Sequence, residues 1–322
     1  MKRFYYLLIF SFVTHFQAFC LQKNHEITDS SELTIGLTIL DIIDVNDEDE
    51  TITIEFFFTL NWLIDSLRNT EIAYSEEVVP WIEMQYLTEL NSSFEKKIPV
   101  DGHGIASFHR KIIGTLRHSF DFTNFPFDHQ DWKLVFFNVL GQTFRIRADT
   151  HYMGLHEDFI DPPTWRTNFT GVEEIKLRGP GPDIRGLAYN FEIKRNSTYY
   201  IWKVLVPIGL IVLMSWGVFW IRPEEIAAQL TVSVTAILTL VAFQFSVSQL
   251  VPPLSYMTTL DKYTVGADFL VFLAFLESLI TSYQAQAQVG RHQFSAKIDR
   301  ASRWIFPISF IFFILMLFYF KI

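Results

Sequence analysis

Hydrophobic and polar residues divide the chain into two parts of different character. In the run TITIEFFFTLNW, residues 51–62, apolar and polar side chains alternate as in a β-strand with one buried face. Runs of similar length and β-branched or aromatic content recur at 33–43, 105–118, 132–140 and 187–195, with turn signals between them. Regular short strands separated by turns predict an all-β sandwich for this first part.

The second part of the chain has four long apolar windows, at about 199–221, 226–251, 259–284 and 304–320. Each is close to the roughly 20 residues that a helix needs to cross a bilayer. The pattern therefore predicts a multi-domain membrane protein. A β-sandwich at 21–198 precedes an all-α four-helix transmembrane domain at 199–322, whose outer faces contact membrane lipid.

The N-terminal 20 residues have a basic head and a short apolar core that ends near Ala18 and Cys20. This arrangement predicts a signal peptide at 1–20, with a retained membrane anchor as the alternative. Because Cys20 is the only cysteine, we expect no internal disulfide in the mature protein.

Lysine and arginine residues predict the orientation of the four spans. They gather at Arg222 and between Arg291 and Arg303, whereas the connection after the second span holds only Lys262. The positive-inside rule then places the β-domain and the C-terminus outside a multi-pass protein of the plasma (inner) membrane. The net charge of -9 and the scarcity of basic clusters argue against a nucleic-acid partner.

The second span has a semi-polar stripe along one face. Its members recur at steps of four and three, which places them on one side of a helix: Thr231, Thr235, Leu238, Ala242, Phe245 and Gln249. Such a stripe suits the wall of a water-filled pore, and one copy cannot enclose a pore. The alternative is a buried bundle helix whose Ser and Thr side chains bond its own carbonyls.

The segment 121–128, DFTNFPFD, contains the motif that carries a family resemblance. Its FPFD, residues 125–128, resembles the hallmark of the Cys-loop receptor superfamily, the pentameric ligand-gated ion channels. The framing cysteines of that family would fall at His118 and Trp132, so the chain resembles a prokaryotic member without the disulfide. Arg195 before the first span, and Pro252 and Tyr256 after the second, continue the resemblance in order. It implies a homopentamer around a central pore.

The resemblance also assigns the pore positions. Thr231 and Thr235 would form narrow inner rings, Leu238 a central hydrophobic ring, and Ala242, Phe245 and Gln249 the outer half. At the cytoplasmic mouth, Glu224 and Glu225 favour monovalent cations, although Arg222 would partly offset them. The alternative is that these acids only stabilise the helix N-terminus.

The ligand site implied by the resemblance lies between neighbouring outer domains, at Phe57, Tyr86, Val139, Ile184 and Tyr189. A valine at position 139, where an aromatic ring is usual, weakens a cation–π cage for a quaternary amine. A primary amine, a carboxylate or protons remain as small-molecule agonists. Histidines in the outer domain leave modulation by pH open, although an ordinary structural role is their default.

The resemblance implies that coupling residues meet at the membrane surface. They are Asp121, Pro126, Asp128, Arg195, Pro252 and Tyr256. The acidic run 44–50 belongs to the same region, or else is only a solvated turn. Arginine can bridge carboxylates with two hydrogen bonds, so we expect an ion pair between Arg195 and Asp128.

These observations together predict a ligand-gated ion channel. The alternatives are a receptor that recruits a cytoplasmic partner, for which the inner loops are very short, and a small transporter. Asp268 and Glu277 are the best evidence for a transporter, because charged groups inside a membrane are costly. The sequence offers no metal-ligand spacing, nucleophile constellation or phosphate loop, so we expect no enzyme activity, no metal site and no cofactor.

Overall fold

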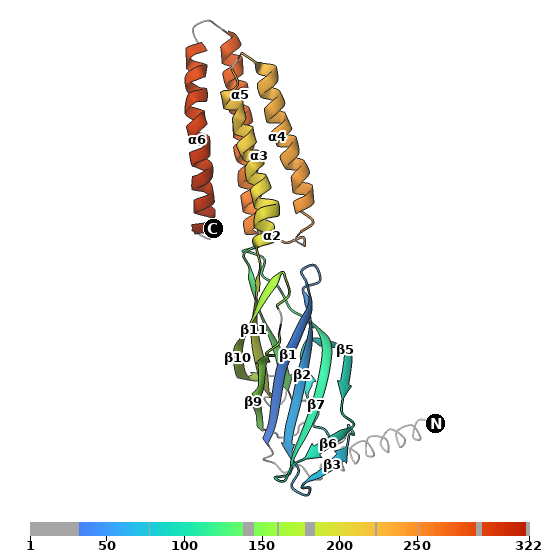
Figure 1. Cartoon of the computed structure of the whole chain (residues 1–322). Helices are drawn as coiled ribbons and strands as arrows, with labels where there is room; N and C mark the ends of the chain where they lie inside the picture. The colour runs from blue at the N-terminus through green and yellow to red at the C-terminus, as the bar shows by residue number, and fades with distance from the viewer. Residues whose placement is uncertain are drawn as a thin grey trace, which may run out of the picture.

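The computed structural model describes residues 32–76, 78–137, 145–159, 161–177, 184–222, 224–250, 252–287 and 292–319. The predicted signal peptide at 1–20 lies outside these ranges and stays a prediction. Figure 1 shows a β-domain and a bundle of helices stacked along one long axis. The two parts join where β11 (Ile184–Arg195) leads into α2 (Thr198–Tyr200). The predicted order, a β-sandwich followed by a helical membrane domain, is confirmed.

The strands that the structure describes form two sheets. A seven-stranded sheet has the order β3-β6-β7-β2-β1-β9, with β5 also paired to β7, and a four-stranded sheet has the order β10-β11-β8-β4. The pairs are antiparallel except for β1 with β9. The strand bounds are β1 Glu32–Asn46, β2 Thr51–Leu63, β3 Thr70–Ala73, β4 Glu83–Met84, β5 Leu87–Phe94, β6 Lys97–Val100, β7 Ile105–Arg117, β8 His129–Phe137, β9 Arg145–Leu155 and β10 Trp165–Leu177.

Strand β2 follows the alternation read from the sequence. Ile52, Ile54 and Phe56 are fully buried, and the residues between them are half-buried. The outer face departs from the pattern at Thr59, which is also fully buried. A methyl group on Gly36 would lie 2.2 Å from the Thr59 hydroxyl and 2.7 Å from the Tyr152 Cβ, so the absence of a side chain at residue 36 permits this close packing.

Aromatic side chains hold the two sheets together. Phe58 of the first sheet stacks on Phe136 of the second with the ring centroids 5.3 Å apart, and within the second sheet the paired Trp132 and Phe191 rings stack at 4.5 Å. Large rings of this kind supply most of the buried apolar area of a sandwich core. The core therefore compensates for the missing disulfide through ring packing.

Four helical stretches among the described residues are long and apolar enough to cross a membrane: Thr198–Trp220, Ile226–Val247, Thr259–Ala285 and Lys297–Tyr319. The first consists of α2, a π-helical turn at Ile201–Leu205, α3 (Val206–Trp216) and a 3₁₀ turn at Gly217–Trp220. Pro207 follows the π-helical turn, and its missing N–H accounts for a widened hydrogen-bonding pattern there. The others belong to α4 (Ile226–Val247), α5 (Thr259–Ala287) and α6 (His292–Tyr319).

The last helix returns to the β-domain. Figure 1 shows the end of α6 near α2, and the Phe318 ring contacts the Phe127 ring edge-on at 5.3 Å. Since Phe127 belongs to the FPFD segment, the C-terminal end of α6 lies on the same side of the membrane as the β-domain. The chain is thus a multi-pass membrane protein with an extracellular N-terminal domain.

Candidate functional site: a free face of the second span and its junction with the outer domain

The second span, α4, has one face packed against its own bundle and another that is free in the single chain. The packed residues are Gln229, Ser233, Ala236 and Leu240. The predicted pore positions are offset from these by two residues, about 200° around a helix, and therefore lie on the opposite side. All six are exposed in the single chain: Thr231, Thr235, Leu238, Ala242, Phe245 and Gln249.

Polar groups on the packed sides of α4 have partners in α5. The Gln229 side-chain oxygen accepts a hydrogen bond from Ser282, the Ser233 and Ser278 hydroxyls lie 3.4 Å apart, and Gln244 donates to Asp268. Paired polar groups are what a helix interface inside a membrane requires. They fix the rotation of α4, so the semi-polar stripe is directed away from the bundle.

Two hydroxyls of α4 bond the helix backbone, as the alternative interpretation expected. Thr231 donates to the Ala227 carbonyl and Thr239 to the Thr235 carbonyl, each at 2.7 Å. Both side chains are nevertheless exposed. A hydroxyl oxygen that donates its proton can still accept, so these residues also offer acceptors to water.

The inner end of α4 is charged and exposed. Arg222, Glu224 and Glu225 are all exposed, and Glu225 occupies the N-cap position without a side-chain capping hydrogen bond. The Gln229 amide donates to the Ile221 carbonyl at 3.1 Å and ties this end to the first span. The acidic pair therefore lies exposed at the inner end of α4, just before its first turn.

The predicted ligand residues are not brought together within one chain. Phe57 lies on β2, half-buried, with its ring 6.0 Å from that of His109. Tyr86 lies in the turn between β4 and β5, is 69% exposed and has a φ of 60°. Val139 lies outside the described residues, as does the side chain of Ile184.

The prediction that Tyr189 lines a ligand site is wrong. Its side chain is fully buried between the sheets, and its hydroxyl donates to the Ile35 carbonyl at 2.5 Å. Burial raises the pKa of the Tyr189 hydroxyl. Because Tyr189 and Phe191 face the core, the neighbouring positions of β11 face outward, and an aromatic ring at 189 cannot reach a neighbouring subunit.

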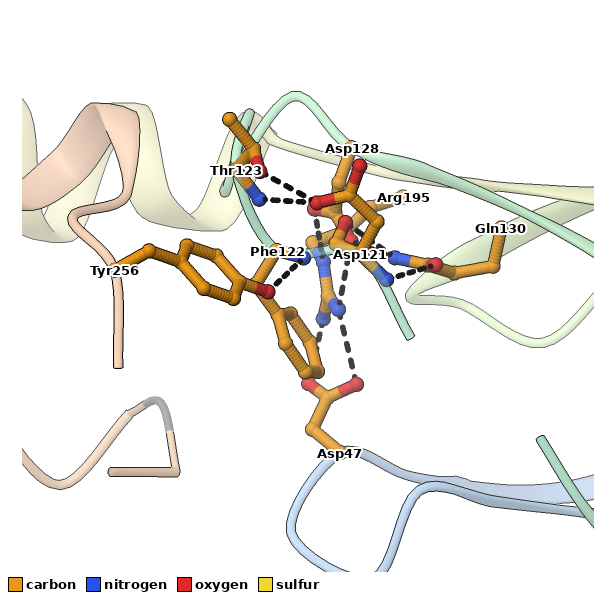
Figure 2. Close-up of polar contacts among 8 residues, drawn as sticks. All are labelled: Asp47, Asp121, Phe122, Thr123, Asp128, Gln130, Arg195 and Tyr256. Atoms are coloured by element: carbon orange, nitrogen blue, oxygen red, sulfur yellow. Dashed lines mark hydrogen bonds and ion pairs between the residues drawn. The ribbon is translucent and has the colours of Figure 1, made fainter. Parts of the chain in front are cut away.

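Arg195, the last residue of β11, is the centre of the junction between the two domains (Figure 2). Its Nε donates to Asp128 Oδ1 at 2.7 Å, and its Nη2 donates to Asp128 Oδ2 at 3.2 Å. Its two terminal nitrogens also donate to the two oxygens of Asp47 at 2.7 and 2.9 Å. The expected contact with Asp128 is present, and a second carboxylate joins it.

The surroundings of Arg195 are aromatic and dry. The guanidinium carbon lies 4.1 Å from the Trp165 ring centroid and 4.9 Å from that of Phe125, and the side chain is only 3% exposed. Burial alone would lower the pKa of Arg195, but the hydrogen bonds that its guanidinium donates to Asp47 and Asp128 outweigh burial and raise the pKa. The guanidinium therefore stays charged and depends on both carboxylates.

Local hydrogen bonds hold each carboxylate in place. In the turn between β1 and β2, the Asn46 side chain accepts hydrogen bonds from the backbone of Glu48 and Asp49, which shapes the turn that presents Asp47. Gln130 donates to Asp128 Oδ2 at 2.8 Å. The run 44–50 is thus more than a solvated turn, because one of its acids forms part of a buried ion pair.

Asp121 does not join the ion pair. Its carboxylate accepts hydrogen bonds from the Thr123 hydroxyl and backbone at 2.6 and 2.9 Å, and these bonds lower the pKa of Asp121. Its backbone N–H bonds the Gln130 side chain at 2.8 Å. Asp121 therefore shapes the loop that carries Asp128, and any effect on Arg195 passes through Gln130.

The FPFD loop also contacts the segment that follows α4. The Phe122 N–H donates to the Tyr256 hydroxyl at 3.0 Å, and Leu260 N–H donates to the Phe125 carbonyl at 3.1 Å (Figure 2 shows the first of these). Pro126 is buried and follows a cis peptide bond. Pro252 lines a cavity of about 510 Å³ between this segment and the turn at 44–48. The predicted coupling residues therefore gather at one interface, with Asp121 at its edge.

Sequence reasoning missed several residues of this junction: Asp47 as an individual partner, Gln130, Trp165 and Phe318. Asp47 lies within the acidic run 44–50, but that run holds five acids that the sequence alone does not distinguish. Gln130 follows Asp128 by two residues, and residues at this spacing share one face of a strand, so the contact between them could have been predicted. Trp165 and Phe318 carry no local pattern that marks them.

Known proteins share these features. Residues 204–296 match the family model described as the neurotransmitter-gated ion-channel transmembrane region. The chain is 28% identical over 224 residues to a gamma-aminobutyric acid receptor subunit beta of Lymnaea stagnalis, which covers 66% of this chain and 44% of the relative. It is 25% identical over 273 residues to the corresponding subunit of Caenorhabditis elegans, covering 79% and 50%. It is also 25% identical over 295 residues to a proton-gated ion channel of Gloeobacter violaceus, covering 86% and 79%.

The fold, the junction and these similarities define a class of membrane receptor in which a β-sandwich is joined to four spans. Its transmembrane region matches that of the neurotransmitter-gated ion channels, and the chain is similar to the pentameric ligand-gated ion channels of the Cys-loop receptor superfamily, in the prokaryotic-type form without the disulfide. The chain spans about half the length of the two receptor subunits and most of the length of the proton-gated channel.

Replacing Arg195 tests the junction. Arg195→Gln removes the charge that two carboxylates require, and breaking a buried ion pair costs about 3–5 kcal/mol. We expect the variant to lose most of its folded, assembled protein in size-exclusion chromatography, with a clearly lowered apparent melting temperature.

Lys97→Gln is the matched control. Lys97 pairs with Glu71 at 2.9 Å, but both side chains are exposed, and exposed pairs of this kind contribute little to stability because water and salt screen them. This variant should behave like the parent protein. Equal stability of the Arg195 and Lys97 variants would contradict the structural role assigned to Arg195.

Proposed function

We propose that five copies of this chain form a ligand-gated ion channel in which the α4 helices surround a shared aqueous axis. The observation that supports this most is the rotation of α4, since its paired polar residues face α5 and its semi-polar stripe is left free. A stripe with Thr hydroxyls and a Gln amide is unsuited to lipid and suited to water. Membrane lipid contacts the outer faces of the bundle.

The gate of this channel is a ring of five Leu238 side chains. In the single chain Leu238 is 63% exposed, near the middle of the free face, and it does not belong to the apolar core that the described residues form. A narrow hydrophobic ring expels water and so blocks ions without a physical plug. Thr231 and Thr235 form the inner rings, and Ala242, Phe245 and Gln249 form the outer half.

The permeant ions are monovalent cations. Five copies of Glu224 and Glu225 place acidic groups at the inner mouth, where a negative potential concentrates cations. The five Arg222 side chains oppose this field and reduce the selectivity. The exposure of all three residues supports a direct effect on ions in solution.

The agonist binds between neighbouring outer domains. Phe57 pairs with Lys111 on β7, and the Tyr86 carbonyl accepts a hydrogen bond from Arg117, six residues further along the same strand. The two positions are thus about 20 Å apart, which is consistent with a site completed by a neighbouring subunit. Val139 and Ile184 are assigned to the same site, whereas Tyr189 is excluded by its burial. An amine, a carboxylate or protons are the agonist classes, in keeping with relatives named for gamma-aminobutyric acid and for protons.

Agonist binding reaches the gate through the Arg195 junction. The guanidinium links the β1–β2 turn, the FPFD loop and the start of the first span, and Tyr256 links the same loop to the segment after α4. Shifting a gate from 1:99 to 99:1 needs about 5.5 kcal/mol of differential binding, or roughly 1 kcal/mol for each of five sites. Coupling energies of this size are common.

Substitution of the proposed gate tests the channel directly. Leu238→Ala widens the ring and lowers the cost of wetting it, so we expect current without agonist to rise several-fold in voltage-clamp recordings. Leu213→Ala is the control, because Leu213 is an exposed leucine on the first span rather than on α4. Unchanged closed-state current in the Leu238 variant would contradict a hydrophobic gate at this position.

Selectivity is tested at the inner mouth. In the double variant Glu224→Gln with Glu225→Gln, the loss of negative charge should move the reversal potential under a salt gradient toward the anion value. Arg222→Gln should move it in the opposite direction, toward the cation value. If the reversal potential is unchanged in both variants, ion selectivity is determined elsewhere along the pore.

A further inference from the structure

Two acidic side chains meet inside the membrane domain, between the third and fourth spans. Glu277 lies on α5 and Asp299 lies on α6, two helices that pack side by side (Figure 1). Asp299 is only 3% exposed, and Glu277 is half-buried. The pair lies toward the inner end of the bundle, because Asp299 is near the start of the span Lys297–Tyr319, which returns outward.

The two carboxyl groups lie close together across the contact between α5 and α6. Glu277 Oε1 accepts a hydrogen bond from the Ser302 hydroxyl at 2.9 Å, and Ser302 follows Asp299 by three residues, so both lie on the same face of α6. Glu277 Oε2 and Asp299 Oδ1 are buried, and the described residues provide neither atom with a donor. A buried hydrogen-bond acceptor without a donor destabilises the folded protein. Ionised carboxylates have no hydrogen to donate, so two of them cannot satisfy each other.

Other charged groups near the pair do not neutralise it fully. Arg303, on α6, attracts Asp299 at longer range, but its Nε donates to the Phe219 carbonyl at 2.9 Å and its guanidinium lies over the Trp220 ring at 5.4 Å. Glu224, before α4, adds a further negative charge near Asp299. Among the described residues, the positive charge of Arg303 is thus offset by the negative charge of Glu224. The repulsion between Glu277 and Asp299, if both are ionised, is therefore not compensated.

We propose that Glu277 and Asp299 bind a single proton between them at neutral pH, which makes this pair an intramembrane proton site joining α5 to α6. Two carboxylates this close are unfavourable when both are ionised and water is largely excluded. One proton removes the repulsion, because the protonated carboxyl of one residue can donate a hydrogen bond to the carboxylate of the other. The pair titrates as one unit.

Protons reach this site from the cytoplasmic side, and their loss affects the contact between α5 and α6. The inner membrane surface is the nearer source of protons, so the occupancy of the site follows cytoplasmic pH. When the pH rises and the proton leaves, two negative charges face each other across the α5–α6 contact and weaken it. This inference does not depend on ion conduction by the chain.

Infrared spectroscopy of the full-length protein in lipid nanodiscs tests the site without any measurement of current. At neutral pH the parent protein should show carboxylic-acid C=O absorption that disappears on raising the pH. Glu277→Gln and Asp299→Asn each replace one carboxyl group by an amide, which can donate a hydrogen bond but does not titrate. Each should lose absorption equivalent to one protonated carboxyl per chain, relative to the parent.

Asp261→Asn is the control on the same helix. The Asp261 carboxylate accepts hydrogen bonds from the Thr258 backbone and hydroxyl at 2.9 and 2.8 Å, which suits an ionised group, so this variant should leave the carboxylic band unchanged. A difference spectrum that is flat for Glu277→Gln or for Asp299→Asn would overturn the shared proton. So would a parent spectrum without carboxylic-acid absorption at neutral pH, a result that needs no variant to fold.

Thermal unfolding provides a second measurement. The parent protein should lose stability as the pH is raised, because the proton that joins the helices is removed. Glu277→Gln should be markedly less sensitive over the same pH range, since its amide keeps the hydrogen bond to Asp299 without a titrating group. Equal pH sensitivity in the parent and this variant would also overturn the site.

Discussion

One buried guanidinium constrains the whole molecule. Arg195 ends the last strand of the outer domain, and the first spanning stretch begins three residues later. Its charge is acceptable in a dry aromatic pocket only because Asp128 and Asp47, from two different loops, bond it together. The end of β11, the β1–β2 turn and the FPFD loop cannot separate without leaving a charged group exposed or unpaired. The outer domain and the first span therefore move as connected bodies.

Polar pairing sets the geometry of the membrane domain in a similar way. Gln229 and Ser233 face α5 because a bilayer offers them no other partner, and their positions determine which residues of α4 remain free. The outer domain reaches this helix through the FPFD loop, which contacts both Arg195 and Tyr256. The same rule, that buried polar groups need partners, thus links the junction, the orientation of α4 and the carboxyl pair between α5 and α6.

Much of this structure could be predicted where the hydrophobic pattern is regular. The alternation in β2 and the four apolar windows indicated the sandwich and the helical domain, and the charge of Arg195 indicated a carboxylate partner. Strands β3, β4 and β6 were missed because they are short, and β9 and β10 because charged residues mask their alternation. Tyr189 was misassigned because one residue of register decides whether a strand side chain faces the core. Asp47 could not be distinguished from neighbouring acids until the turn formed.

The central claim is that the free face of α4 lines water. Single cysteines placed along residues 231–249, in a background without Cys20, can be tested with a water-soluble thiol reagent in intact membranes. The account predicts reaction at 231, 235, 238, 242 and 245, with protection at 233, 236 and 240, where the helix packs against its own bundle. Uniform protection along the helix, or reaction centred on Ser233 and Leu240, would contradict it.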